Sequence, residues 1–151
     1  MAQTGAMPAF IGYPKQQVLA VFDTAGEAAR AMQALEVAGV SGTAIERFEG
    51  AADADRFDAT GARHGPVART LRAVQFGLMD QMPAMAWYEA ALRSGSVVVA
   101  VRTRDRPGTL RAVEALRGAG GHFINRFGRL ATEEFARWRG PEPPVASLMK
   151  H

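Results

Sequence analysis

Two segments of this chain, residues 18–48 and 97–127, carry the same succession of residue types. In each one an apolar run leads into an amphipathic stretch that ends at a glycine, Gly39 or Gly120, and a second short strand-like segment, TAIERF or HFINRF, follows. An apolar run, a helical period and a second short strand are typical of a β-α-β unit. We therefore predict that the chain contains two copies of one such unit. This duplication constrains the architecture, but by itself it assigns no chemistry.

Two successive β-α-β units with right-handed crossovers assemble into one antiparallel sheet with helices on one face. The sequence thus predicts an α+β fold, a ferredoxin-like four-stranded antiparallel sheet with an inserted helical pair. Strands are expected at 18–22, 43–48, 97–101 and 123–127, and the first and third should be central neighbours. Both are apolar without alternation, as in strands covered on both faces. Because a ferredoxin-like sheet has one open face, the insert helices or a partner subunit must cover it.

The two units define the expected boundaries of the domain. Residues 16–139 are predicted to form a single ferredoxin-like domain. Residues 1–15 read as a flexible lead-in, since they contain two glycines and two prolines, and residues 140–151 read as a disordered tail, since they begin with one glycine and three prolines within five residues.

Three segments outside the two units have their own predictions. Residues 49–65 are rich in Ala, Asp and Gly and are expected to be a loop. The helical insert is predicted over about 65–95, with its second helix beginning near Pro83. Residues 132–138 carry acids first and arginines last, which favours a short terminal helix.

Local signals mark where the helices of the two units begin. Thr24 and Glu27 form a capping-box pattern before the first helix. Asp105 is a candidate N-cap for the second, with Pro107 in its first turn. The buried stripe of this second helix is predicted to be Leu110, Val113 and Leu116.

Composition excludes several classes of site. The chain has no cysteine, so disulfides and thiolate metal sites are excluded. His64, His122 and His151 are scattered, whereas zinc usually takes three or four ligands, so no metal or cofactor is expected. No carboxylate pair, nucleophile–base arrangement or phosphate loop stands out. No catalytic residue is therefore predicted, and whether the chain is an enzyme stays open.

The expected location follows from hydropathy. No apolar run approaches the ~20 residues that span a bilayer, so no membrane partner is expected. The first residues also lack a basic cluster followed by a long apolar segment. We expect a cytoplasmic protein.

Charge is unevenly distributed, although the net charge is only +3. Residues 1–62 hold eight acids and four bases, whereas residues 93–139 hold ten arginines and four acids. Such asymmetry favours attraction between the halves, within one molecule or across the homodimer that we expect. Arg102, Arg104 and Arg106 alternate after the third strand, so an extended backbone would place them on one side as a nucleic-acid or anion site. Acids interrupt every basic run, so a solvated face is the simpler interpretation and nucleic acid is disfavoured.

The segment that leads into the second unit carries a family resemblance. Tyr88, Gly95, the apolar run 97–101 and the helix ending at Gly120 follow one another in order. In this it resembles the YflT-type general stress protein family of small bacterial proteins, and the likeness covers roughly residues 17–128. The resemblance implies a stress-associated cytoplasmic protein without an established catalytic role. It transfers no functional residue.

A weaker resemblance concerns the turn before the second helix. Asp105-Arg-Pro-Gly108 after a strand is similar to the opening of ACT domains, which sense amino acids. That likeness implies a ligand against the backbone amides near Asp105 and Gly108, although a plain helix cap accounts for the same residues. Trp87 and Tyr88 are a second candidate, either as a pocket with the Tyr88 hydroxyl as ligand or as packing over the sheet.

Three hypotheses about function follow. The first is a non-enzymatic stress-associated protein that acts through protein–protein contacts. The alternative is an ACT-like sensing module that binds a small molecule at the Asp105–Gly108 turn or under the insert helices. The third is a nucleic-acid binder that uses the arginines of the carboxyl-terminal half.

Overall fold

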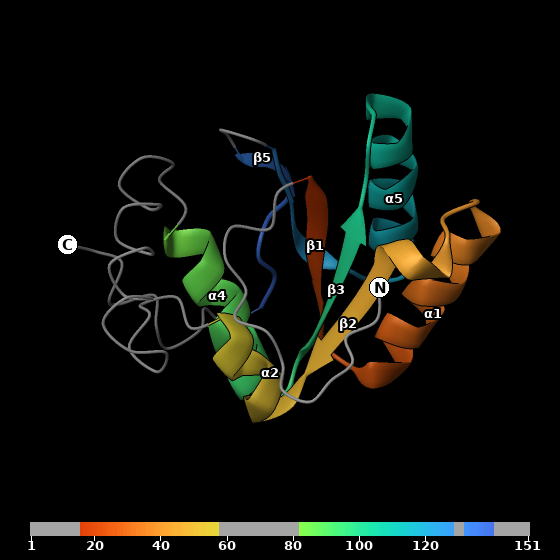
Figure 1. Cartoon of the computed structure of the whole chain (residues 1–151). Helices are drawn as coiled ribbons and strands as arrows, with labels where there is room; N and C mark the ends of the chain where they lie inside the picture. The colour runs from red at the N-terminus through yellow and green to blue at the C-terminus, as the bar shows by residue number, and fades with distance from the viewer. Residues whose placement is uncertain (1–15, 58–81, 129–131, 141–151) are drawn as a thin grey trace.

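The computed structural model of this chain describes residues 16–57, 82–128 and 132–140. Its strands are β1 (Gln17–Phe22), β2 (Ile45–Glu49), β3 (Val97–Arg102), β4 (His122–Phe127) and β5 (Thr132–Ala136). Its helices are α1 (Ala25–Val37), α2 (Gly50–Phe57), α4 (Met82–Arg93) and α5 (Arg106–Gly118), with a 3₁₀ turn, η1, at Gly42–Ala44. The strands form one antiparallel sheet in the order β2-β3-β1-β4-β5 (Figure 1).

The α+β class and the antiparallel sheet are confirmed, but the sheet has five strands where four were predicted. The helix predicted over 132–138 is wrong, because residues 132–136 form β5 and pair with β4. Acids first and arginines last suit a helix, yet β4 offers an unpaired edge to this segment. Phe135 also packs against the core on the α1–α5 side of the sheet. Tertiary pairing here overrides the local preference.

The loop predicted over 49–65 is also wrong in its first part, where residues 50–57 form α2. The Asp53 carboxylate accepts a hydrogen bond of 2.9 Å from the Glu49 amide at the start of this helix. Ala54 and Phe57 are buried on one face of α2. The predicted strand 43–48 begins only at Ile45, because η1 precedes it. The first insert helix, the lead-in and nearly all of the tail lie outside the described residues.

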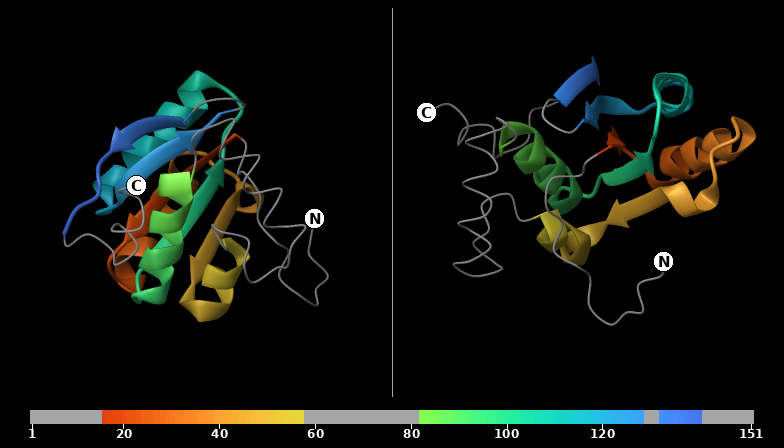
Figure 2. Two further views of the ribbon diagram at one scale, coloured as in Figure 1. Left: turned by 90° about the vertical axis from the view of Figure 1, so that its left-hand side faces the viewer. Right: turned by 45° about the horizontal axis from the view of Figure 1, so that its top comes forward.

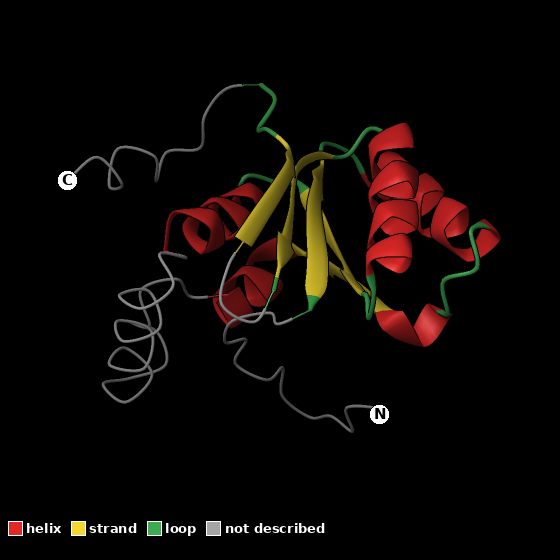
Figure 3. Ribbon diagram, turned by 90° about the horizontal axis from the view of Figure 1, so that it is seen from above, coloured by secondary structure: helices red, strands yellow, loops and turns green. Residues whose placement is uncertain are grey.

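Two helical layers enclose the sheet (Figure 3). Helices α1 and α5 cover one face and receive Val18, Ala20 and Phe22 of β1. Helices α2 and α4 lie side by side on the other face, over Leu19 and Val21 (Figure 2). The central strand is therefore buried on both faces, as its unbroken apolar sequence predicts. Of the two covers considered for the second face, helices of the same chain supply it.

Strands β1 and β3 are interior neighbours, as predicted, with Gln17 opposite Arg102 and Phe22 opposite Val97. The predicted cap of α1 is also present, although Glu27 bonds to the amide of the residue before the N-cap Thr24. The Thr24 hydroxyl accepts from the Glu27 amide at 3.1 Å, and the Glu27 carboxylate reaches back to the Asp23 amide at 3.2 Å. The turn after β1 is thereby held at the first turn of α1.

Candidate functional site

Tyr88 on α4 is a core residue with no exposed surface. Its hydroxyl donates toward the carbonyl oxygens of Phe123, at 2.8 Å, and Leu19, at 3.1 Å, and accepts from Asn125 Nδ2 at 3.0 Å. A tyrosine hydroxyl has a single hydrogen to donate, so these contacts use its donor capacity fully. Desolvation by burial raises the pKa of Tyr88 far above its usual value. The hydroxyl is therefore engaged by hydrogen bonds within the fold, and the ligand role considered for Trp87 and Tyr88 stays a prediction.

The partners of Tyr88 lie at an irregularity of the sheet. The register between β1 and β4 shifts between Leu19 and Val21. Within the same stretch Phe123 has a φ of +48°, which is strained for a bulky residue. A bulge turns backbone groups out of the regular ladder. Here the carbonyl oxygens of Leu19 and Phe123 accept from a side chain of the overlying helix.

Trp87 takes part in an aromatic cluster beside this bulge. Its ring stacks on Phe123, with centroids 5.3 Å apart, and meets the edge of Trp138, also at 5.3 Å. Trp138 in turn contacts the His122 ring at 5.0 Å. For both Trp87 and Tyr88 the packing interpretation therefore fits the geometry, since α4 uses these two side chains to hold β4 and the segment after β5.

The Asp105–Gly108 turn is a helix cap. Asp105 Oδ1 accepts from the Gly108 amide at 2.8 Å. A Cβ at position 108 would lie 2.9 Å from that same oxygen, so the cap explains both the acid and the glycine. A ligand at this turn would have to displace the Asp105 side chain from the amide it would use. The ACT-like site stays a prediction.

The three arginines predicted to share a face are directed apart. Arg102 donates to the Thr43 carbonyl oxygen at 2.7 Å, next to edge strand β2. Arg106 forms an ion pair of 2.7 Å with Glu133 on β5, at the opposite edge. The alternation fails because β3 ends at Arg102 and Arg106 already begins α5. Arg104 is exposed between them.

The Arg106–Glu133 pair gives a pH-dependent prediction. The hydrogen bond from Arg106 lowers the pKa of Glu133. A lowered carboxylate pKa adds stability above the unfolded value, and this is lost as pH falls through the folded pKa. The gain is small because the pair is exposed. In an NMR titration, Arg106→Gln should raise the midpoint of the Glu133 carboxyl, whereas the matched Arg104→Gln should leave it in place. An unchanged midpoint in Arg106→Gln would contradict the pair.

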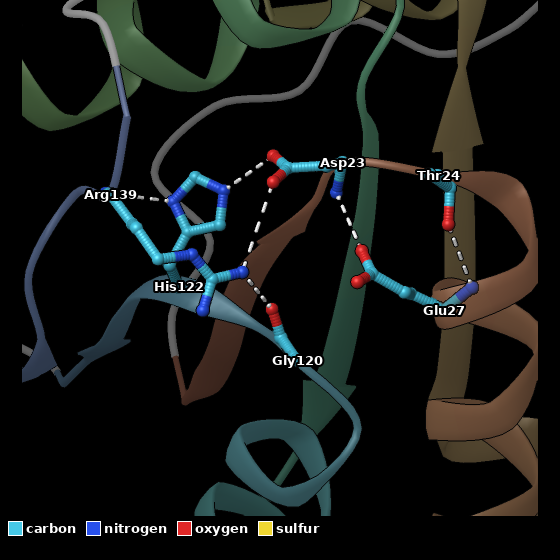
Figure 4. A network of polar contacts seen from close by, with 6 residues as sticks. All are labelled: Asp23, Thr24, Glu27, Gly120, His122 and Arg139. Carbon is cyan, nitrogen blue, oxygen red and sulfur yellow. Dashed lines mark hydrogen bonds and ion pairs between the residues drawn. The ribbon is translucent and has the colours of Figure 1, made fainter.

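A polar cluster that the sequence did not indicate surrounds His122, at the start of β4 (Figure 4). The imidazole is 3% exposed, and its Nε2 lies 2.9 Å from Asp23 Oδ1. Nδ1 accepts from the Arg139 amide at 3.1 Å, so the ring proton is on Nε2 and is donated to Asp23. The Arg139 guanidinium donates to the Gly120 carbonyl oxygen at 2.8 Å.

A histidine beside an aspartate is also the arrangement that activates nucleophiles in hydrolases. In this protein both ring nitrogens are already bonded and the ring is buried. Accepting a proton at Nδ1 would break the bond to the Arg139 amide. The hydrogen bonds of this cluster therefore hold together the end of β1, the α5–β4 connection and the segment after β5. Asp23 and His122 are 99 positions apart, so no local pattern links them.

The outer surface of the α1–α5 layer carries a shallow groove of about 470 Å³. Val37 in this groove is 85% exposed, and Leu110, predicted to be buried, is 44% exposed. These two are the exposed large hydrophobic residues of the part of the chain that the structure describes. The groove is lined by Ala34, Val37 and Ala38 of α1 and by Leu110, Arg111, Glu114 and Ala115 of α5. Unlike the residues above, this surface has apolar side chains that the fold leaves in solvent.

Among the described residues, no group of three or more His, Asp or Glu side chains could hold a metal ion. None of the helices in these residues has the length and apolarity needed to cross a membrane. No protein-family model, curated protein or solved structure matches the chain.

Proposed function

We propose that this chain is a non-enzymatic, cytoplasmic, stress-associated protein that acts through protein–protein contacts, with the α1–α5 groove as its contact surface. The observation that carries the proposal is the groove itself, where Val37 and Leu110 are exposed together. Single exposed apolar side chains are ordinary, whereas here two of them line one groove together with Ala34, Ala38 and Ala115. The candidates for small-molecule chemistry, Tyr88 and Gly108, are engaged by internal hydrogen bonds.

The assignment to stress and to the cytoplasm is supported by the resemblance of residues 17–128 to the YflT-type family. We also propose that β2-β3-β1-β4 is the ferredoxin-like arrangement of two repeated units, with β5 added at one edge. The helices of the two units, α1 and α5, end with the same hydrogen bond, which supports the repeat. The Val40 amide bonds to the Leu35 carbonyl oxygen at 2.9 Å, and the Gly121 amide bonds to the Leu116 carbonyl oxygen at the same distance.

The contact surface can be tested by photocrosslinking in the cells that make the protein. A photoreactive residue in place of Val37 is expected to give discrete crosslinked species of higher mass. The matched control is Ala52, which is exposed on α2, on the other face of the sheet. We expect no discrete species there. If the residue at position 37 crosslinks neither to another protein nor to a second molecule of this chain, the proposal is wrong.

A screen of amino acids and nucleotides by thermal shift separates this proposal from ACT-like sensing. Melting that does not respond to ligands is expected, because a ligand that binds only the native state raises the melting temperature. A rise of several degrees with one compound would contradict the proposal. Gly108→Val is not a clean probe of that alternative, since a side chain there displaces the Asp105 cap.

A further inference from the structure

We infer that the partner on the α1–α5 groove is a second copy of this chain, with α5 packed antiparallel against the partner subunit's α5 across a two-fold axis. The inference rests on the proposed function and names the partner that it leaves open. A two-fold interface joins one surface patch to itself, so the patch must complement itself. The outer face of α5 meets this condition.

The charges on this face are complementary under a two-fold rotation. Arg111 and Glu114 both line the groove, three positions apart on α5. If the axis passes between Ala112 and Val113, Arg111 faces the partner subunit's Glu114, and Glu114 faces the partner subunit's Arg111. Within the chain, Glu114 is 79% exposed and reaches Arg117 only at 3.7 Å. A surface with one sign of charge would call for a different protein as partner, whereas this surface carries both signs at reciprocal positions.

The same axis also matches side-chain sizes. Leu110 is placed opposite the partner subunit's Ala115, and Ala115 opposite the partner subunit's Leu110. Ala115 lines the groove together with Ala34 and Ala38 of α1, so small side chains there leave room for an incoming leucine. At the ends of the contact Pro107 faces the partner subunit's Gly118, where neither residue has a long side chain.

This docking buries the exposed hydrophobic residues of the groove. Leu110, now 44% exposed, enters the partner's groove, and Val37, 85% exposed, lies on the wall of its own. Burying these side chains in both subunits supplies the apolar part of the association. The reciprocal ion pairs then fix the register of the two helices.

The test is the mass in solution of the full chain, measured by light scattering after size exclusion over a range of concentrations. The wild type is expected to have the mass of two chains. Arg111→Glu and Glu114→Arg should each weaken dimerisation by roughly tenfold or more, because like charges then meet at two symmetric places. The double variant R111E/E114R restores opposite charges and should restore the dimer. Arg30→Glu, on an exposed position of α1 outside the groove, is the matched control and should leave it intact.

Each other outcome overturns the inference. A monomeric wild type would contradict the inference that the partner is a second copy. A dimer that neither single charge reversal weakens would contradict the assignment of the interface to α5. Failure of R111E/E114R to recover, with an unchanged melting curve, removes the reciprocal pairing. The Val37 crosslinks distinguish these failures from failure of the proposed function. Crosslinks to other proteins by a monomeric chain would leave that function standing, whereas the absence of crosslinks would remove both.

Discussion

Tyr88→Phe is expected to lower the free energy of unfolding by about 1–3 kcal/mol, although the substitution removes only one oxygen atom. The reason is the set of groups left behind. The carbonyl oxygens of Leu19 and Phe123 lose a donor, and Asn125 Nδ2 loses its 3.0 Å acceptor, all at a fully buried hydroxyl. Denaturant unfolding of the two proteins measures the difference. Tyr88→Ala, which also removes the ring, should cost about 3–5 kcal/mol.

A double-mutant cycle with Asn125→Leu controls for the loss of the hydroxyl itself. Removing Tyr88 Oη or the Asn125 amide alone leaves the other buried and less satisfied, whereas removing both leaves fewer orphaned groups. The double variant should therefore cost less than the sum of the single variants. Additive effects, or a Tyr88→Phe protein as stable as the wild type, would contradict the network. The hydroxyl would then be free to serve a ligand, as the pocket interpretation of the sequence requires.

The burial of the Tyr88 hydroxyl can also be tested by measuring stability at alkaline pH. Burial raises the pKa of Tyr88 above its usual value of 10.0, so the native state keeps this proton where the unfolded chain loses it. Stability therefore declines as pH rises above 10.0, because the unfolded state then binds fewer protons. Tyr88→Phe should remove part of that decline. Comparing denaturant midpoints of the two proteins on both sides of this pH measures it.

What the sequence could predict follows from local information. Unbroken apolar runs marked β1 and β3 as interior strands, and the residues at Thr24 and Asp105 marked the starts of two helices. The need for a cover on the second face followed from the same runs. The α2 helix was missed because its first residues are small or acidic, and only Ala54 and Phe57 of it are buried. Strand β5 was missed because it depends on the free edge of β4.

The candidate site was less predictable, because it depends on distant contacts. The Tyr88 hydroxyl is fixed by a bulge in strands far from it in sequence, and Asp23 meets His122 only once β1 pairs with β4. Leu110 fits a helical stripe with Val113 and Leu116, yet it lies at the margin of that stripe and is exposed. Periodicity locates the centre of a buried face, and the width of the face is set by the neighbouring helix.

Gly121→Ala is expected to destabilise the protein by about 1–3 kcal/mol, the cost of forcing extra volume into a packed site. Gly121 lies between α5 and β4, where its amide bonds to the Leu116 carbonyl oxygen. An added Cβ would lie 2.8 Å from that oxygen and 2.9 Å from Cζ of Phe22. The first atom belongs to the backbone, and the second to a ring with no exposed surface, so neither can simply move aside. Thermal or denaturant unfolding measures the loss.

Gly26→Ala in the first turn of α1 is the matched control, since the same methyl group meets only ordinary contacts at 3.9 Å or more. Alanine has the higher helix propensity, so this variant should match or exceed the wild type by up to about 1 kcal/mol. The two substitutions are chemically identical and are expected to have opposite signs. If Gly121→Ala were as well tolerated as Gly26→Ala, the α5–β4 connection could not approach Phe22 as closely as it does here. His122 directly follows Gly121, so its position would then be in doubt too, and with it the hydrogen bonds that join His122 to Asp23 and Arg139.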